Sequence, residues 1–180
     1  MTKRIDVFGW GFIGLLGAIL IYVVAGTLEP HVTNAGDTAP NFKITADNGK
    51  TITRDDFGGK LLVLNFWASW CPPCVTETPS LEQFAQTMAP QGVVVVAISQ
   101  DRKEEQYKKF IERYKITFET ARDPGADIAA SYGTFQIPET YLIGRDGKVI
   151  EKVISNQDWM DPEFLSHVRK MIGAAPVSGT

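Results

Sequence analysis

Two cysteines, separated by two prolines in Cys71-Pro72-Pro73-Cys74, are the residues of this 180-residue chain best suited to chemistry. At the start of a helix, positions i and i+3 lie about 5–6 Å apart, which is within the range that a disulfide needs. The unpaired N–H groups and the positive dipole end of a helix N-terminus favour a thiolate at Cys71. Cys74 can then attack a mixed disulfide and release a substrate. The pair therefore predicts thiol–disulfide exchange.

Other uses of a Cys-x-x-Cys pair fit this sequence less well. A covalent haem site needs a histidine after the second cysteine, and this chain has Val75 there. A zinc site needs a second cysteine pair or a histidine pair, but the two histidines, His31 and His167, are far apart. A structural disulfide remains an alternative, although closing so short a loop constrains the unfolded chain little. No metal, nucleotide or flavin motif is present, so the expected cofactor is the redox-active cysteine pair itself.

The segments around the cysteines predict the elements that position them. Lys60–Trp67 is a nearly continuous apolar run, typical of a parallel strand covered on both faces. Residues 75–89 have a helical pattern, so Cys71 falls at a helix N-terminus and Cys74 one turn further on. A strand followed by a Cys-x-x-Cys helix, within alternating strands and helices, is a specific signal for redox chemistry.

The rest of the chain continues this alternation. Asp146-Gly147 favours a tight antiparallel hairpin, and Asp161-Pro162 is typical of a helix start, with a capping residue before a proline. The predicted order is a hairpin (42–45 with 51–53), a strand (60–67), a helix (75–89), a strand (93–99), a helix (107–114), a short helix (125–132), a hairpin (140–144 with 148–154) and a final helix. This order predicts an α/β fold with helices on both faces of a mixed central sheet.

Composition limits the class of protein. Hydrophobic residues make up 44% and charged residues 22%, close to the average of soluble globular proteins, which excludes disorder for most of the chain. The length suits one domain of roughly 100–150 residues with an appendage. The formal net charge of −3 argues against a nucleic acid partner, because a phosphate backbone calls for a basic face.

The appendage is apolar. Residues 7–26 contain no charge, and twenty helical residues span about 30 Å, the hydrocarbon thickness of a bilayer. Because Lys3 and Arg4 precede this segment, we expect a cytoplasmic N-terminus (1–6), a transmembrane anchor (7–26) and a C-terminal domain outside the membrane. The alternative is a cleaved signal peptide, although the apolar cores of such peptides usually run about 7–15 residues. The remaining predicted parts are a linker (27–39), a globular domain (40–173) and a flexible tail (174–180).

Three motifs match a known family. They are Gly36-x-x-Ala39-Pro40-x-Phe42, the stretch 65–74 (NFWASWCPPC) and the stretch 133–143 (GTFQIPETYLI). The chain from about Asp37 to Gly173 resembles the membrane-anchored, thioredoxin-like proteins of the TlpA/ResA type, which include thiol reductases of cytochrome c biogenesis. The resemblance implies a thioredoxin-like fold.

The resemblance also implies roles for residues far from the cysteines. Ile137-Pro138 matches a cis-proline that faces the cysteine pair and presents the preceding backbone to an extended substrate. From the sequence alone, Pro138 could simply begin the following strand. Pro79 matches a proline that kinks the active-site helix, where it removes a hydrogen bond to Val75.

Asn65 and Glu77 mark the branch of the family. Thioredoxin carries a buried aspartate where this chain has Asn65, which cannot exchange protons at working pH. The TlpA/ResA-type branch has this asparagine and a glutamate shortly after the second cysteine, matched by Glu77, so we expect Glu77 to handle protons and to have a raised pKa. The alternative is a solvated acid that interacts only with the helix dipole.

The expected substrate-binding residues are Trp70, Pro72, Pro73, Ile137 and Pro138, whereas core packing is expected for Trp67. By resemblance, the partners are a disulfide-bearing extracytoplasmic protein, such as apocytochrome c, and a membrane thiol–disulfide electron donor. The expected location is the inner membrane, with a single pass and the globular domain on the periplasmic side.

Other functions remain open. Peroxiredoxins share this fold, but they carry a serine or threonine three residues before the reactive cysteine and a proline seven before it, where this chain has Ala68 and Leu64. A tether with an inert disulfide is a further alternative. The direction of electron flow is also open, although Pro72 and Pro73 supply no charge and no amide donor, which favours a reductase over an oxidant or isomerase.

Overall fold

The N-terminal part of the chain forms a helix of its own. The computed structural model describes residues 7–27 and 32–173, and the chain divides into a unit up to His31 and a second unit from Val32. The helix expected over residues 7–26 is present as α1 (Val7–Thr27). Within the described ranges, no helix has both the length and the apolar character needed to cross a membrane. The predicted cytoplasmic residues (1–6) and tail (174–180) lie outside the described residues.

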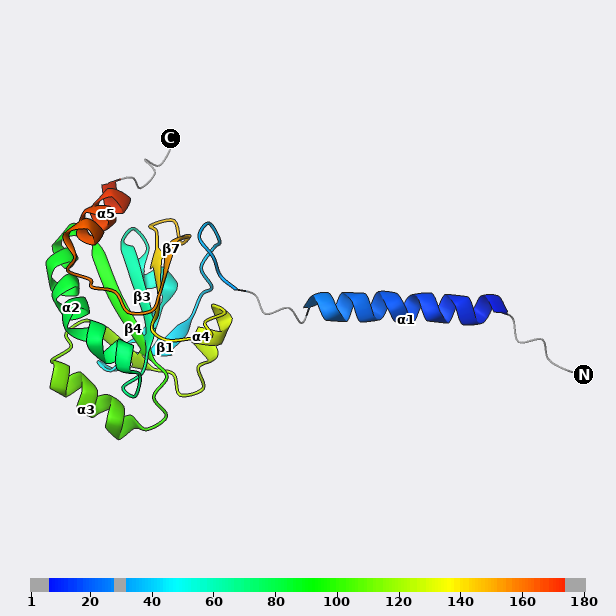
Figure 1. Cartoon of the computed structure of the whole chain (residues 1–180), viewed down its shortest axis with the longest axis horizontal. Coiled ribbons are helices and arrows are strands. Elements are labelled where there is room, and N and C mark those ends of the chain that lie inside the picture. The colour runs from blue at the N-terminus through cyan, green and yellow to red at the C-terminus, as the bar shows by residue number, and fades with distance from the viewer. Residues whose placement is uncertain (1–6, 28–31, 174–180) are drawn as a thin grey trace, which may run out of the picture. The chain divides into compact units, whose positions relative to one another are not determined.

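The second unit is built on a mixed five-stranded sheet in the order β5-β4-β3-β6-β7 (Figure 1). The strands are β3 (Leu61–Trp67), β4 (Val93–Ser99), β5 (Glu119–Arg122), β6 (Glu139–Ile143) and β7 (Val149–Ile154). β3 is parallel to β4 and antiparallel to β6, and β6 forms the expected antiparallel pair with β7. The first hairpin, β1 (Lys43–Thr45) with β2 (Thr51–Thr53), forms a separate two-stranded sheet.

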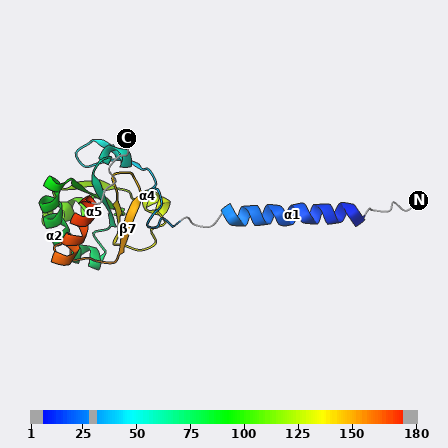
Figure 2. The ribbon, with the colours of Figure 1, turned by 90° about the horizontal axis from the view of Figure 1, so that it is seen from above.

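Helices cover both faces of the sheet, as expected (Figures 1 and 2). The α-helices of this unit are α2 (Pro72–Met88), α3 (Glu104–Tyr114), α4 (Asp127–Ser131) and α5 (Pro162–Gly173). This unit also contains two short 3-10 helices, η1 (Arg54–Phe57) and η2 (Ala89–Gln91). The predicted cap is present at α5, where the Phe164 N–H donates to the Asp161 carboxylate at 2.9 Å.

Successive side chains of β3 point to opposite faces of the sheet, as in any strand, so they pack against different layers. Leu64 packs in a core cluster with Ile52 of the hairpin and with Tyr132, which follows α4. Val63 packs in a second cluster with Phe84 of α2 and with residues of α5. Asn65 has the same parity as Val63, so its side chain is directed towards the α2 layer, where the cysteine helix lies.

Two features differ from the expectations. Strand β5 was not predicted, because Glu119–Arg122 has no apolar run and forms an edge strand through its pairing with β4. The second half of the predicted linker (27–39) is packed rather than free. Thr33 and Ala39 are buried, and the Thr33 N–H donates to the carbonyl of Tyr132 at 3.0 Å. The packed unit therefore begins before residue 40.

Candidate active site

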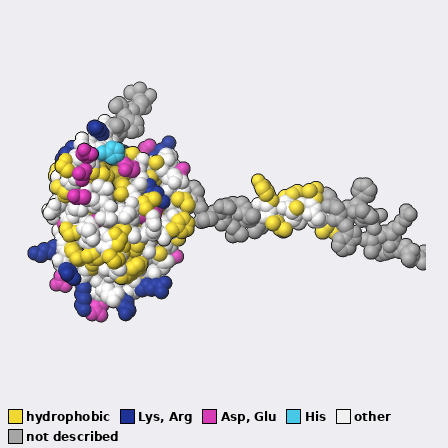
Figure 3. Space-filling view, in the orientation of Figure 1, with side chains coloured by type: hydrophobic (Ala, Val, Ile, Leu, Met, Phe, Trp, Pro, Cys, Tyr) yellow, Lys and Arg dark blue, Asp and Glu magenta, His cyan; other side chains and the backbone are white. Residues whose placement is uncertain are grey.

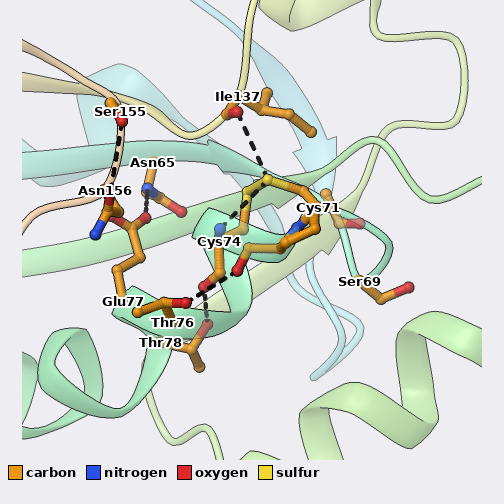
Figure 4. Close-up of a disulfide and its surroundings, with 12 residues drawn as sticks. Asn65, Ser69, Cys71, Cys74, Thr76, Glu77, Thr78, Ile137, Ser155 and Asn156 are labelled. Carbon is orange, nitrogen blue, oxygen red and sulfur yellow. Dashed lines mark hydrogen bonds between the residues drawn. A yellow bond between two sulfur atoms is a disulfide. The ribbon is translucent and has the colours of Figure 1, made fainter.

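The cysteine pair lies at the start of α2, shortly after the end of β3 (Figure 4). The two sulfurs form a disulfide, with the Cα atoms 5.3 Å apart. Cys71 is the N-cap residue of α2, and its sulfur accepts a hydrogen bond from the Cys74 N–H at 3.3 Å. Both cysteines are buried, with exposed fractions of 4% for Cys71 and 1% for Cys74. The oxidised pair is thus shielded from solvent.

The predicted position of Cys71 at a helix N-terminus is confirmed. The helix starts at Pro72, with both prolines in its first turn. Proline fits the first helical position, where its missing N–H would have had no helical partner. Pro72 and Pro73 consequently leave the Cys74 N–H as the first amide of the helix that can reach the Cys71 sulfur. Pro79 lies inside α2, as the resemblance implies.

A second segment approaches the cysteines from the loop before β6. The peptide bond between Ile137 and Pro138 is cis, which confirms the expectation from the family resemblance. The carbonyl oxygen of Ile137 lies 3.5 Å from the Cys71 sulfur (Figure 4). The backbone next to Pro138 thus lies against Cys71.

Glu77, three residues after Cys74 in α2, is buried, with 3% of its surface exposed. It accepts hydrogen bonds from the Asn65 side-chain amide at 3.1 Å, the Gln157 N–H at 3.2 Å and the Trp159 indole N–H at 3.4 Å. Asn65 also donates to the Thr140 hydroxyl at 2.8 Å, so it bridges α2 and β6. Glu77 is therefore not the solvated acid of the alternative interpretation. It accepts from three neutral donors, and no ion pair to it occurs within the described part of the chain.

Burial raises the pKa of Glu77 from 4.5 to about 7, and the hydrogen bonds from Gln157, Asn65 and Trp159 oppose this shift only in part. The direction agrees with the expectation from the sequence, and desolvation is its main cause. A carboxyl group with a pKa near 7 is present in both protonation states at neutral pH. It can therefore either donate or accept a proton there.

Asp101, just after β4, was not singled out in the sequence. Its side chain is fully buried, and its carboxylate accepts from the Ser69 N–H at 2.9 Å, the Ser69 hydroxyl at 2.7 Å and the Ser99 hydroxyl at 2.7 Å. These bonds hold the loop that leads from β3 to Cys71. An aspartate two residues after a buried strand was the available signal, but aspartate is also common in ordinary loops.

The surface beside the cysteines is apolar. Trp70, which precedes Cys71, is 61% exposed, and Pro72 is also exposed. Phe135, in the loop that leads to the cis-proline, is 73% exposed and was not predicted. Trp67 is buried against α3, as expected for a core residue. Exposed aromatic residues therefore lie on both segments that approach the disulfide.

No cluster of three metal-ligating side chains occurs among the residues that the structure describes. The site holds two sulfurs, a helix N-terminus and a buried carboxyl group. This set suits the exchange of disulfides through thiolates.

Comparisons with known proteins agree with this chemistry. The model of the AhpC/TSA family matches residues 35–152. The thiol-disulfide oxidoreductase ResA of Bacillus thuringiensis subsp. konkukian is 38% identical over 122 residues, which cover 68% of this chain and 70% of the relative. ResA of Geobacillus thermodenitrificans is 33% identical over 143 residues, which cover 78% of this chain and 82% of the relative. Among solved structures, the thiol:disulfide interchange protein DsbE from Chlorobium tepidum has a TM-score of 0.73 and 29% identity, covering 78% of this chain and 99% of that one.

Proposed function

We propose that this chain, which belongs to the AhpC/TSA family and is a thiol-disulfide oxidoreductase, reduces disulfides in extracytoplasmic proteins. The observation that carries the proposal is the Cys71–Cys74 disulfide at the start of α2, facing the Ile137 carbonyl. The named relatives are thiol-disulfide oxidoreductases, which supports exchange at this pair.

In the proposed reaction, the Cys71 thiolate attacks one sulfur of a substrate disulfide. The substrate S–S bond breaks, a mixed disulfide forms, and the leaving sulfur takes up a proton. Cys74 then loses its proton and attacks the Cys71 sulfur, which releases the second substrate thiol. The substrate has gained two electrons and two protons, and the protein is left as the disulfide that the structure holds.

Glu77 is proposed to handle the protons of these steps. Its protonated form can supply a proton on the way to the leaving sulfur, and its carboxylate can receive one from Cys74. A pKa of about 7 makes both forms available at neutral pH. Asn65, Gln157 and Trp159 hold the carboxyl group in place in this scheme.

The direction of electron flow is argued from the first turn of α2. A potential rises when the reduced thiolate is well stabilised, and helix N–H groups are a major source of that stabilisation. Here Pro72 and Pro73 have no N–H, so the Cys74 amide alone donates to the Cys71 sulfur from this turn. We therefore expect a reducing potential, near the thioredoxin end of the range of about −270 to −120 mV.

Equilibration of the protein with glutathione buffers tests this direction. The fraction of Cys71–Cys74 disulfide, measured by thiol alkylation and mass spectrometry, gives the potential. A value above about −180 mV, the range of disulfide isomerases, would contradict the reductase assignment. Rapid consumption of hydrogen peroxide by the reduced protein would instead favour the peroxidase alternative.

The proposal includes the membrane anchor, the substrate and the electron source. Residues 7–26 have no charge, and Lys3 and Arg4 precede them, which supports one membrane pass with the globular unit on the periplasmic side of the inner membrane. Apocytochrome c is a proposed substrate, and a membrane thiol–disulfide donor is the proposed source of electrons. No cofactor beyond the cysteine pair is proposed.

Alkaline carbonate extraction tests the anchor. An uncleaved anchor keeps the protein in the membrane pellet, with Lys3 and Arg4 still present in its N-terminal peptide. A soluble product that begins near Gly26 would identify residues 7–26 as a cleaved signal peptide instead.

A further inference from the structure

A groove runs beside the cysteine pair, between α3 and the loop that precedes Cys71. It has a volume of about 340 Å³. Its lining residues are Ser69 and Trp70 from the loop and Gln106, Lys109, Phe110 and Arg113 from α3. The four α3 residues follow the spacing i, i+3, i+4 and i+7, so they share one face of the helix. The groove is therefore one side of a regular helix set against the active-site loop.

The charges in this groove are all positive. Lys109 and Arg113 line it, and no carboxylate does, although the chain as a whole has a net charge of −3. Arg113 has no ion-pair partner within the described residues, and its guanidinium lies 5.6 Å from the Tyr114 ring centre. Lys109 pairs with Glu105, but both side chains are more than 70% exposed, so this pair is weak and open to exchange.

The groove lies next to the cysteine pair along the chain. Trp70 forms part of its wall and is joined directly to Cys71. Asp101 fixes this wall through two hydrogen bonds to Ser69, so the groove keeps a defined position relative to the disulfide. Figure 3 shows a hydrophobic patch on the lower part of the globular unit, with Lys and Arg side chains and some Asp and Glu side chains below it. A substrate sulfur placed at Cys71 would bring the neighbouring residues of the substrate to the groove.

We propose that this groove binds an acidic segment next to the reacting disulfide of the protein substrate. Carboxylates of the segment pair with Lys109 and Arg113, and an apolar residue beside them packs on Trp70 and Phe110. This inference names a preference within the proposed reductase function and rests on that function. It predicts that substrates with acidic residues beside the disulfide are reduced faster than substrates with basic ones, because charge complementarity mainly raises the rate of productive association.

The test compares two synthetic peptides. Each contains one disulfide, and they differ only in glutamates or lysines beside it. The full-length protein is reduced first, and kcat/KM is measured for each peptide at low salt and at about 0.5 M salt. Each rate is divided by the rate with dithiothreitol, an uncharged dithiol, because flanking charges also change the intrinsic reactivity of a disulfide.

The corrected rate for the acidic peptide should exceed that for the basic peptide by about tenfold at low salt, as two exposed ion pairs allow. The ratio should fall towards one at high salt. The double variant Lys109→Gln/Arg113→Gln should reduce the ratio to about two at low salt. The double variant Lys103→Gln/Lys108→Gln is the matched control: it also removes two positive charges, at exposed positions at the start of α3 and within it that do not line the groove, and it should keep the parent ratio.

Three outcomes would overturn the inference. A parent ratio near one would refute the preference for acidic segments. An equal loss in Lys103→Gln/Lys108→Gln and in Lys109→Gln/Arg113→Gln would show that the effect comes from net charge and not from the groove. Reduction of neither peptide would refute the proposed reductase function itself, and the inference with it.

Discussion

The burial of Glu77 can be tested quantitatively, because its raised pKa makes the free energy of unfolding depend on pH. The folded protein raises the pKa of Glu77 from 4.5 to about 7, so it holds this proton more tightly than the unfolded chain. The stabilising contribution is complete below pH 4.5 and is lost as the pH rises through about 7. Between pH 5 and pH 8, this linkage reduces the free energy of unfolding by about 2.5 kcal/mol.

The variant Glu77→Gln removes that dependence. A glutamine oxygen can accept from the Gln157 and Trp159 N–H groups, and its amide can donate to Asn65 once that side-chain amide has turned over. We therefore expect parent and variant to be similarly stable near pH 5. At pH 8 the variant should have gained about 2.5 kcal/mol relative to the parent.

Urea denaturation followed by tryptophan fluorescence measures this gap at each pH. The protein is kept oxidised, so the Cys71–Cys74 disulfide stays closed and neither sulfur titrates. Glu163→Gln, which removes an exposed carboxylate from α5, controls for the loss of one charge. A gap between parent and Glu77→Gln that stays constant from pH 5 to pH 8 would show that Glu77 does not titrate as the buried group described here.

Three further predictions concern the reaction and the loop that supports it. Glu77→Gln should reduce disulfide substrates about tenfold more slowly and lose the dependence on pH near 7, measured in steady-state assays. Cys74→Ser should accumulate a mixed disulfide between Cys71 and the substrate, visible by mass spectrometry, whereas Cys71→Ser should accumulate none. Asp101→Ala leaves the Ser69 N–H and two hydroxyls without their acceptor, so urea denaturation should show a loss of about 3 kcal/mol. Asp101→Asn keeps one acceptor oxygen and should lose less than half as much.

The sequence predicted those parts of the site that depend on short-range patterns. The apolar run before Cys71 and the helical pattern after Cys74 locate the disulfide at a helix N-terminus, because adjacent elements determine that position. The cis bond before Pro138 came from the family motif, since proline alone fits several turns equally well. The burial of Glu77 was an expectation of the same origin, and it now has an observed cause in the packing of α2.

Long-range contacts could not be predicted in this way. The donors Gln157 and Trp159 lie 80 and 82 residues after Glu77, in a loop with no pattern that relates it to the cysteine helix. Strand β5 was missed for a similar reason: its four residues form a strand because β4 offers a free edge, not because of their own preference. The groove of Lys109 and Arg113 likewise depends on where α3 lies against Trp70.

Glu77→Gln is expected to lower the reaction rate but to raise the stability at pH 8. Measuring both therefore tests whether Glu77 handles protons. General damage to the fold would slow the reaction and lower the stability together. Removal of a buried acid with a pKa of about 7 should slow the reaction and, at pH 8, raise the stability. Both effects have one physical cause, because the desolvation that disfavours the carboxylate also places its pKa where it can exchange protons at neutral pH. A variant that is slower and less stable at pH 8 would therefore assign Glu77 to packing alone. A variant that is slower and more stable would show that the Glu77 carboxylate destabilises the folded protein but is needed for the reaction.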